Sequence, residues 1–267
     1  MTEGRVTDYD RVAGHYDTRY SHLSYAGVQE TVLRFLGPEP VATLEVGCGT
    51  GHWLAALAAR PRSAKALAER PAERAILAGV EPSSEMIARA RVAAPQARLV
   101  RGRAEALPWQ DATFDRIFCV NALHHFADRQ QFFAEARRVL KPGGGLLTVG
   151  KDPHAERDTW WVYDYFAATR PIDLVRFARV RTLRGELSLA GFAWTESSEA
   201  DQIEALQPAT EALANGIVDP GFTSQLSVLS AEEFARGAQK IRDANAAADG
   251  ELQLVTDFHL YATIGWT

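Results

Sequence analysis

The sequence predicts an α/β fold in which a mostly parallel, seven-stranded sheet carries helices on both faces. Short apolar runs alternate with helical patterns between residues 41 and 152, and parallel strands need crossovers of a dozen or more residues that pack back onto the sheet. The chain is 46% hydrophobic and 24% charged, which supplies enough apolar side chains for one large core. We therefore expect a single domain over residues 1–267.

The first 36 residues predict an N-terminal helical cap. Val28, Val32 and Phe35 are spaced for one helix face ahead of the Gly37-Pro38 stop. Five apolar runs follow and predict strands of a cofactor-binding core over 41–152. These runs occupy 41–47, 75–81, 97–102, 114–122 and 145–152. Ser83 and Asp128 are expected to cap the helices that follow the second and fourth strands.

The last section, 153–267, predicts substrate-side helices, a lid and the final strands. We expect a Trp/Tyr-rich helix at about 157–169, a strand at 192–199, a helical lid over 202–249 and a last strand at 254–266. Ser230 to Glu233 matches a capping box that starts a helix in this lid. These two strands bring the expected sheet to seven.

Composition excludes several classes of function. A net charge of −5 argues against a binder of nucleic-acid phosphates, which needs a basic stripe. Two cysteines are too few for a disulfide framework or a cysteine-built zinc site, and we expect no metal. The longest uncharged stretch, Val46–Ala59, is shorter than the ~20 residues of a membrane span. The first twenty residues scatter both signs of charge, so we expect a cytoplasmic protein without a membrane partner.

The segment LEVGCGTGHW places Gly47, Gly49 and Gly51 at the turn from a strand into a helix. Glycine permits positive φ and a close backbone approach to a ligand, and the helix N-terminus offers N–H groups to an anion. Glu81 ends the next strand, where a carboxylate can accept hydrogen bonds from two ribose hydroxyls. A dinucleotide fingerprint would require glycine in place of His52. The loop fits E-x-G-x-G-x-G better and predicts a nucleoside ligand, with an ordinary tight turn as the alternative.

Four stretches together resemble the class I S-adenosylmethionine-dependent methyltransferases of the small-molecule type, over roughly Tyr9 to Gly150. YDRVAGHYD is similar to the family's N-terminal cap, LEVGCGTG to its glycine motif and GVEPSSEMI to its ribose motif. RGRAEALPWQDATFDRIFCVNALHHF, with LKPGGGLLTVG, is similar to its middle portion. The resemblance implies a Rossmann-like fold and S-adenosylmethionine as cofactor. It also implies in-line transfer of a methyl group to an O, N or C atom of a small organic acceptor.

The resemblance assigns cofactor-binding residues one by one. At the methionine end it implies Glu45 and the loop after it, with Tyr16 as a further polar candidate. The loop residues are Gly47, Cys48, Gly49, Thr50 and Gly51. The ribose would be held by Glu81, flanked by Pro82 and Ser83. The remaining assignments are Met86 against the adenine, the backbone N–H of Ala104 on the adenine ring, and Asn121 near the sulfonium. For Met86 and Asn121, helix packing and strand-end capping are equal alternatives.

Two positions depart from the family pattern. Arg103 stands where the family's G-D-A-E-x-L-P stretch has an acid that accepts the adenine amino hydrogen, and arginine has only donors. Glu105 or a backbone carbonyl is the candidate replacement, while Arg103 itself is expected either to point to solvent or to act at the site. The separation of Gly51 from Glu81 also exceeds the about 20 residues of such a unit. We expect a surface excursion from Arg60 to Arg74.

His124 and His125, directly after the fourth strand, are the candidate catalytic residues. Histidine titrates near neutral pH and can remove a proton from an acceptor that arrives protonated. A structural role is the alternative for each, and His154 and Asp152 are weaker candidates. No Asn/Asp-Pro-Pro-Tyr motif follows the fourth strand, which disfavours nucleic-acid or glutamine methylation.

Five aromatic residues on the expected helix at 157–169 either pack in the core or line an acceptor pocket. They are Trp160, Trp161, Tyr163, Tyr165 and Phe166. Two other functions stay open. One is a catalytically silent nucleoside-binding or regulatory protein on the same fold, and the other is an NAD(P)-dependent oxidoreductase. The sequence does not predict the oligomeric state.

Overall fold

A computed structural model of the chain describes residues 7–39, 41–60 and 76–267. These residues divide into two compact units, each built from segments far apart in the chain. Unit 1 contains the residues up to Tyr25, Lys151–Ala178 and Asp201–Leu260. Unit 2 contains Ala26–Gly150, Arg179–Ala200 and Tyr261–Thr267. One unit boundary, between Gly150 and Lys151, lies close to the expected border of the cofactor-binding core.

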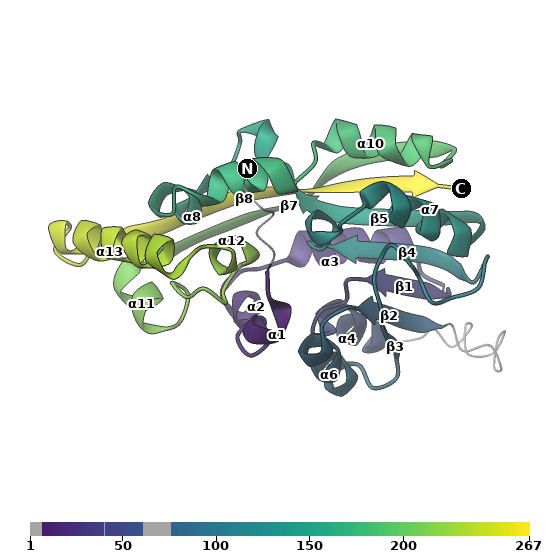
Figure 1. Cartoon of the computed structure of the whole chain (residues 1–267), viewed down its shortest axis with the longest axis horizontal. Helices are drawn as coiled ribbons and strands as arrows, with labels where there is room; N and C mark the ends of the chain where they lie inside the picture. The colour runs from purple at the N-terminus through teal and green to yellow at the C-terminus, as the bar shows by residue number, and fades with distance from the viewer. Residues whose placement is uncertain (1–6, 40, 61–75) are drawn as a thin grey trace. The chain divides into compact units, whose positions relative to one another are not determined.

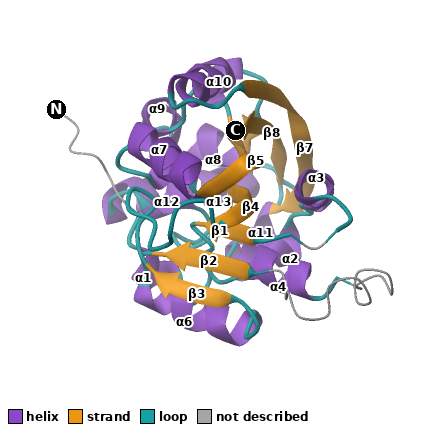
Figure 2. Cartoon of the chain, turned by 90° about the vertical axis from the view of Figure 1, so that its right-hand side faces the viewer, coloured by secondary structure: helices purple, strands orange, loops and turns teal. Residues whose placement is uncertain are grey.

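Unit 2 is built on parallel strands that lie side by side (Figure 2). The strands are β1 (Thr43–Val46), β2 (Leu77–Glu81), β3 (Arg98–Arg101), β4 (Phe114–Val120) and β5 (Leu140–Lys151, up to Gly150 in unit 2). The pairs β1·β2, β2·β3, β1·β4 and β4·β5 are all parallel. The helices of this unit are α3 (Ala26–Leu36), α4 (His52–Ala58), α6 (Ser84–Ala93), η1 (Leu123–His125), α7 (Arg129–Val139) and α10 (Val180–Leu189). The expected αβ alternation is confirmed (Figure 1).

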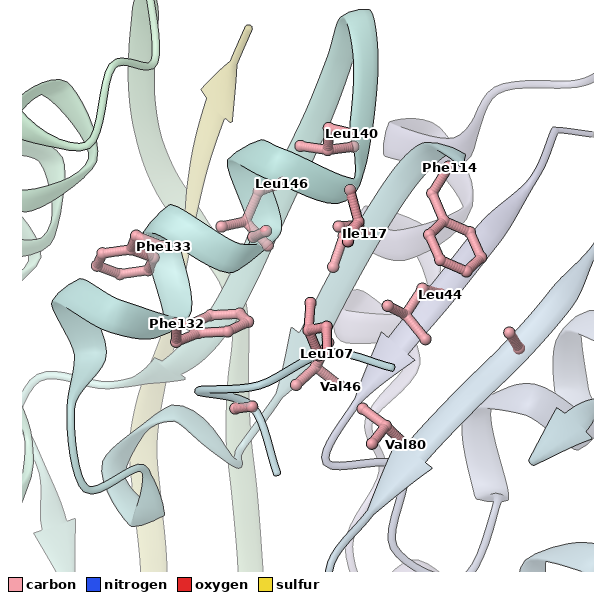
Figure 3. Packing of buried hydrophobic residues seen from close by; sticks show 14 of the residues in the cluster. Leu44, Val46, Val80, Leu107, Phe114, Ile117, Phe132, Phe133, Leu140 and Leu146 are labelled. Atoms are coloured by element: carbon pink, nitrogen blue, oxygen red, sulfur yellow. The ribbon is translucent and has the colours of Figure 1, made fainter. Parts of the chain in front are cut away.

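Apolar side chains cover both faces of these strands, as a parallel sheet requires. On one face Leu44, Val46 and Val80 pack with Phe132 and Phe133 of α7, and all five are buried (Figure 3). On the other face Cys48, Leu54 of α4 and Ala94 form a second buried cluster, with Leu77 and Leu99 of the strands against it. Helices on both faces leave the carboxyl ends of the strands as the open edge for ligands.

The complete sheet has eight strands, not the expected seven. Its hydrogen-bonded order is β3-β2-β1-β4-β5-β8-β6, and β7 pairs with β8 outside that path. The additional strand is β6 (Thr159–Trp160), which pairs antiparallel with Asp257 and Thr256. The long strands β7 (Trp194–Pro208) and β8 (Gln253–Trp266) each have residues in both units.

The remaining helices belong to unit 1. They are α1 (Tyr9–Val12), α2 (Thr18–His22), η2 (Pro153–Ala155), α8 (Trp161–Tyr165), α9 (Thr169–Arg176), α11 (Ala209–Ala214), α12 (Ser224–Ser227) and α13 (Ala231–Ala247). α13 packs on α8 through Gly237, where a Cβ atom would lie 2.2 Å from Cδ1 of Phe166. The expected cap helix before Gly37 is present as three helices, α1 to α3.

Local capping signals were predicted correctly. The side chain of Ser83 accepts a hydrogen bond from the backbone N–H of Met86, and Asp128 accepts one from Gln131. Ser230 and Glu233 form the complete capping box at the start of α13. The expected surface excursion from Arg60 to Arg74 lies, beyond Arg60, outside the described residues.

Two predicted elements of the last section are wrong. The single helix at 157–169 is instead β6 followed by the short helix α8, because Trp160 is extended, with φ of −144°, and pairs with β8. The lid predicted as helical over 202–249 begins with a strand, since β7 continues to Pro208. Pairing with β8 overrides the helix propensity of the Ile203–Leu206 segment, and Ile203 is buried on the sheet.

Candidate cofactor site

Almost all of the predicted site residues lie at one edge of unit 2. The glycine loop follows β1, Glu81 ends β2, Arg103 to Glu105 follow β3, and Asn121 follows β4. Because these four strands are parallel neighbours, their carboxyl ends meet at the same edge of the sheet. The fold therefore brings together residues as far apart in the chain as Gly47 and Asn121.

The backbone conformation and the tight packing of the glycine loop favour glycine at three positions. Gly47, Gly49 and Gly51 have φ of +73°, +52° and +84°, in the region that favours glycine. A Cβ atom on Gly47 would lie 2.5 Å from Cβ of Ala122, and one on Gly51 would lie 3.0 Å from Cα of Ala90. The backbone N–H of Gly47 donates to the carbonyl of Val80 at 2.9 Å. The loop is thus held between β2, α6 and the segment after β4.

Glu81 is fixed by the backbone at both carboxylate oxygens. Its Oε2 accepts a hydrogen bond from Gly49 N, and its Oε1 accepts one from Ser83 N, each at 3.0 Å. Only 6% of Glu81 is exposed. These two hydrogen bonds fix the orientation of a buried carboxylate at the carboxyl end of β2.

Glu45 is a buried acid with an unused acceptor atom. It is 1% exposed, and its Oε2 has no hydrogen-bond partner among the described residues. Burial raises the pKa of this carboxyl well above its ordinary value; the negative charge of Glu81 adds to the increase, and a hydrogen bond from Leu54 N opposes it. A buried acceptor without a donor is costly. The arrangement fits a cationic or N–H donor group supplied by a ligand.

Glu105, the candidate replacement for the missing acid, has partners within the chain. Its carboxylate accepts a 2.7 Å hydrogen bond from Ala127 N and is 3.3 Å from Nε of Arg103. Burial alone would raise its pKa, but these backbone hydrogen bonds and the arginine hold it below the ordinary value. Glu105 therefore anchors the chain after β4. The Arg103 side chain is 66% exposed, which corresponds to the solvent-facing alternative, while Met86 and Ala104 are buried.

The segment after β4 carries strain next to the glycine loop. Asn121 has φ of +50°, which is uncommon for a residue other than glycine, and its N–H donates to Val149 O at 2.8 Å. Such conformations persist where the surroundings enforce them, and they concentrate at functional sites. His124 and His125 follow within η1, with ring centroids 3.9 Å apart and both rings half-buried.

The other predicted residues have plainer surroundings. Cys48 is buried, and burial raises the pKa of its thiol well above the ordinary value, so it is not a reactive thiolate. Pro82 is exposed, and Thr50 is buried in the loop. Asp152 caps His154, whose Nε2 lies 3.1 Å from Phe177 O. These contacts are structural.

Tyr16 belongs to unit 1, where it contacts a residue that the sequence did not single out. Cζ of Arg19 lies 3.8 Å from the centroid of the Tyr16 ring. In a second group of unit 1, Tyr163, one of the five aromatic candidates, joins three charged residues that the sequence did not single out; Lys151, Asp158 and Asp173 complete this buried network. Of the five aromatic residues considered for a pocket, Trp160, Trp161 and Phe166 are core residues. In the sequence, both groups are visible as charged residues spaced among aromatic ones.

Comparison with known proteins shows the family to which the chain belongs. Residues 44–148 match the family model described as a methyltransferase domain. A demethylmenaquinone methyltransferase of Thermotoga maritima is 30% identical over 169 residues, which cover 60% of this chain and 68% of that protein. The chain belongs to the class I S-adenosylmethionine-dependent methyltransferases. A malonyl-[acyl-carrier protein] O-methyltransferase of Methylococcus capsulatus is another relative of this methyltransferase, 34% identical over 163 residues, covering 60% of the chain and 54% of that relative.

Solved structures show the same fold. The YcgJ protein of Bacillus subtilis has a TM-score of 0.59 at 19% identity, covering 91% of this methyltransferase and 99% of that chain. A SAM-dependent methyltransferase of Thermotoga maritima has a TM-score of 0.56 at 20% identity, covering 97% of both chains. The chain spans about half to two thirds of the length of the curated relatives it matches. Within the described part of the methyltransferase, every helix is too short or too polar for a membrane span.

Proposed function

We propose that this methyltransferase transfers the methyl group of S-adenosylmethionine to an O, N or C atom of a small organic acceptor. The observation that carries the proposal is the pair of acids at the carboxyl edge of unit 2. Glu81 is a carboxylate held in place by two backbone N–H groups, and Glu45 has a buried oxygen without a donor among the described residues. S-Adenosylmethionine has the ribose diol and the ammonium group that these two acids can accept from.

The residues present fit this cofactor along its whole length. Glu45 and the backbone of Gly47 to Gly51 would hold the methionine end, Glu81 with Ser83 the ribose, and Met86 with Ala104 the adenine. Bound there, the sulfonium supplies an electrophilic methyl group and leaves as a neutral thioether. The task of the protein is then to align the acceptor, and positioning of this kind can lower a barrier by ~7–11 kcal/mol. Asn121 belongs to the proposed site because its strained backbone follows β4 beside the glycine loop.

A proton has to be removed only where the acceptor arrives protonated. We propose His124 or His125 as the base, because they are imidazoles next to the strained end of β4. The acceptor is proposed to be a small organic molecule, such as the demethylmenaquinone that the name of one relative indicates. A cytoplasmic location is part of the same proposal. So is the lack of a nucleic-acid partner, which the net charge of −5 favours.

Ligand-dependent melting tests the function. S-Adenosylhomocysteine should raise the melting temperature and NADH should not, because Glu81 and the three-glycine loop suit a nucleoside with an amino-acid tail. A ligand at 100 times its dissociation constant adds ~2.7 kcal/mol to the free energy of unfolding. A shift with NADH alone would assign the chain to the oxidoreductases. Binding of S-adenosylhomocysteine without turnover on a panel of acids, phenols, amines and quinones would assign it to the silent binding proteins.

A further inference from the structure

The segment that carries the two histidines after β4 is held at its near end by the sheet and the glycine loop. The N–H of Asn121 donates to Val149 O at 2.8 Å. Ala122 lies against the loop, where a Cβ atom on Gly47 would come within 2.5 Å of its own Cβ. His125 N donates to Ala122 O at 2.9 Å and closes the single turn of η1. The first half of the segment is therefore fixed to the carboxyl edge of unit 2.

The far end of the same segment is held by Glu105. Its Oε1 accepts a hydrogen bond from Ala127 N at 2.7 Å and a longer one from Asp128 N at 3.4 Å. The side chain of Asp128 in turn accepts from Gln131 N and caps α7. Ala127 and Asp128 are both exposed, so the core does not cover this joint. One carboxylate oxygen thus fixes the place where η1 passes into α7.

Two other contacts near this joint are weaker restraints on the backbone. Phe126 packs edge-on against Phe132 of α7, with ring centroids 4.8 Å apart, but a ring contact satisfies no backbone N–H group. The Arg103 side chain lies 3.3 Å from Oε2 of Glu105 and is largely exposed, so this ion pair adds little. Hydrogen bonds to a charged acceptor are directional and about twice as strong as neutral ones. They set the course of the backbone after η1.

We propose that Glu105 is a positioning residue for the methyl transfer, which holds the two histidines of η1 in place through the backbone N–H groups that follow them. The inference deepens the proposed function and rests on it, because it takes His124 or His125 as the base. Proton removal requires the base within hydrogen-bond reach of the acceptor. An error of about 1 Å in such a placement can cost ~100-fold in rate. Loss of the Glu105 carboxylate should therefore act on the chemical step.

The turn after β3, proposed for the adenine, has restraints of its own. Ala106 N donates to Arg103 O at 3.3 Å, and Leu107 N donates to Oε2 of Glu135 at 2.8 Å. These bonds do not involve the Glu105 side chain, so this backbone should keep its place when that side chain is removed. A positioning role therefore predicts a loss of turnover that exceeds the loss of cofactor affinity.

The first measurement compares turnover with binding in Glu105→Ala. Methyl transfer from S-adenosylmethionine to the panel of acids, phenols, amines and quinones gives kcat and KM, and calorimetry gives the affinity for S-adenosylhomocysteine. We expect kcat to fall about 10- to 100-fold while this affinity changes less than about threefold. Glu105→Gln keeps one acceptor oxygen for Ala127 N and should recover most of kcat. If the alanine variant does not fold, Glu105→Asp replaces it, because the shorter side chain withdraws the carboxylate and should lower kcat about tenfold.

Combination with the histidine variants separates positioning from general loosening. Residues that act through one another have non-additive effects. In whichever of His124→Asn and His125→Asn has lost the base, Glu105→Ala should therefore cost about twofold or less in kcat. A loss that persists undiminished in that background would overturn the proposal. Full activity of both histidine variants would overturn it as well, since the protein would then have no histidine base to position.

Asp115→Ala is the matched control. Oδ2 of Asp115 accepts from Ala42 N at 2.8 Å and lies 3.0 Å from Nζ of Lys141. These are the same kinds of contact that Glu105 makes, but they lie near the start of β4, at the opposite end from the site. Asp115→Ala should lower the melting temperature and leave kcat unchanged. An unchanged kcat in Glu105→Ala as well would assign Glu105 to stability alone.

A second readout decides on Glu105 without turnover. Imidazole ¹H–¹³C spectra of the free protein, assigned with His124→Asn and His125→Asn, report the surroundings of both rings. Glu105→Ala should shift these two signals and Asp115→Ala should not, whereas unchanged signals in both would refute the proposal. If no compound of the panel is methylated, or S-adenosylhomocysteine does not bind, the proposed methyl transfer fails, and the spectra still show whether Glu105 holds the two histidines.

Discussion

The carboxylate of Glu81 accepts a hydrogen bond from the backbone N–H of Gly49 at 3.0 Å, so the acid at the end of β2 and the loop after β1 are fixed to each other. The other oxygen of the carboxylate holds Ser83 N at the start of α6. One side chain thereby sets the distance between the parts of the site proposed for the methionine end and for the ribose. Changes at Glu81 should act on both.

Glu81→Ala should weaken binding of S-adenosylhomocysteine by about tenfold or more. A hydrogen bond to a charged group contributes ~1.5–3 kcal/mol, and the variant also leaves Gly49 N without its acceptor. Glu81→Gln should have a smaller effect because it keeps one acceptor oxygen. Glu30→Ala, which removes an exposed acid paired with Arg34, is the control. Calorimetry showing wild-type affinity for Glu81→Ala would remove this acid from the ribose.

Gly47→Ala should lower both stability and cofactor affinity. Alanine at positive φ costs ~1–2 kcal/mol, and overpacking against Ala122, whose Cβ would be only 2.5 Å away, adds ~1–3 kcal/mol. Gly143→Ala is a matched control, since Gly143 has φ of +75° and an added Cβ would have no described residue within 4 Å. Thermal unfolding should show the strain cost for both variants and the additional loss only for Gly47→Ala. Equal losses would mean that the loop can move away from Ala122.

Arg103→Asp should leave cofactor affinity equal or improved. The change supplies the acidic acceptor that the family usually has at this position, and it gives up an exposed ion pair with Glu105, which is worth ~0–1 kcal/mol. Calorimetry with S-adenosylhomocysteine measures the effect, and Arg103→Ala separates loss of the arginine from gain of the acid. A severe loss in both variants would give Arg103 a specific role at the site.

Local signals in the sequence predicted much of this edge, and long-range contacts account for what was missed. Ser83 and the three glycines could be assigned because capping and positive φ depend on a few adjacent residues. The hydrogen bond from Ala127 N to Glu105 could not be predicted, because the two residues are 22 positions apart in the chain. The strand at 202–208 was missed for the same reason, since its pairing with β8 is not encoded locally. The stacking of Arg19 on Tyr16 and Tyr20 was missed as well, because it depends on how the side chains pack in the folded protein.

His124→Asn and His125→Asn should separate the two candidate bases. A positioned general base contributes ~10²–10⁴-fold in rate, so one variant should lose turnover on a protonated acceptor while it still binds S-adenosylhomocysteine. Its remaining activity should also lose the rise with pH near neutrality that titration of an imidazole produces. His154→Asn is the control, because that ring is engaged with Phe177 O. Full activity in both variants would mean that the acceptor arrives deprotonated or needs no base.

Glu135→Gln should reduce stability in a manner that depends on pH. Both oxygens of Glu135 bind Arg138 at 2.8 Å, and Oε2 also accepts from Leu107 N at 2.8 Å. The hydrogen bonds from Arg138 hold the pKa of this carboxyl below its ordinary value. A lowered pKa in the folded protein means that the unfolded chain takes up the proton first. The stabilisation is therefore complete above the ordinary glutamate pKa of about 4.3 and is lost as the pH falls through the lower, folded value.

Urea unfolding of the wild type and Glu135→Gln at pH 7 and at acid pH measures this linkage. At pH 7 the variant should lose ~1.5–3 kcal/mol of the free energy of unfolding, the range for hydrogen bonds to charged groups. The difference in free energy of unfolding between the wild type and the variant should become smaller in acid, because the wild-type carboxyl is then protonated and uncharged, like the glutamine. Arg138 also donates to the carbonyls of Leu107 and Trp109, so the loss should loosen the β3–β4 segment near Ala104 and weaken S-adenosylhomocysteine at pH 7. A difference in free energy of unfolding that stays constant from pH 7 into acid would show that Glu135 stabilises through packing rather than through its charge.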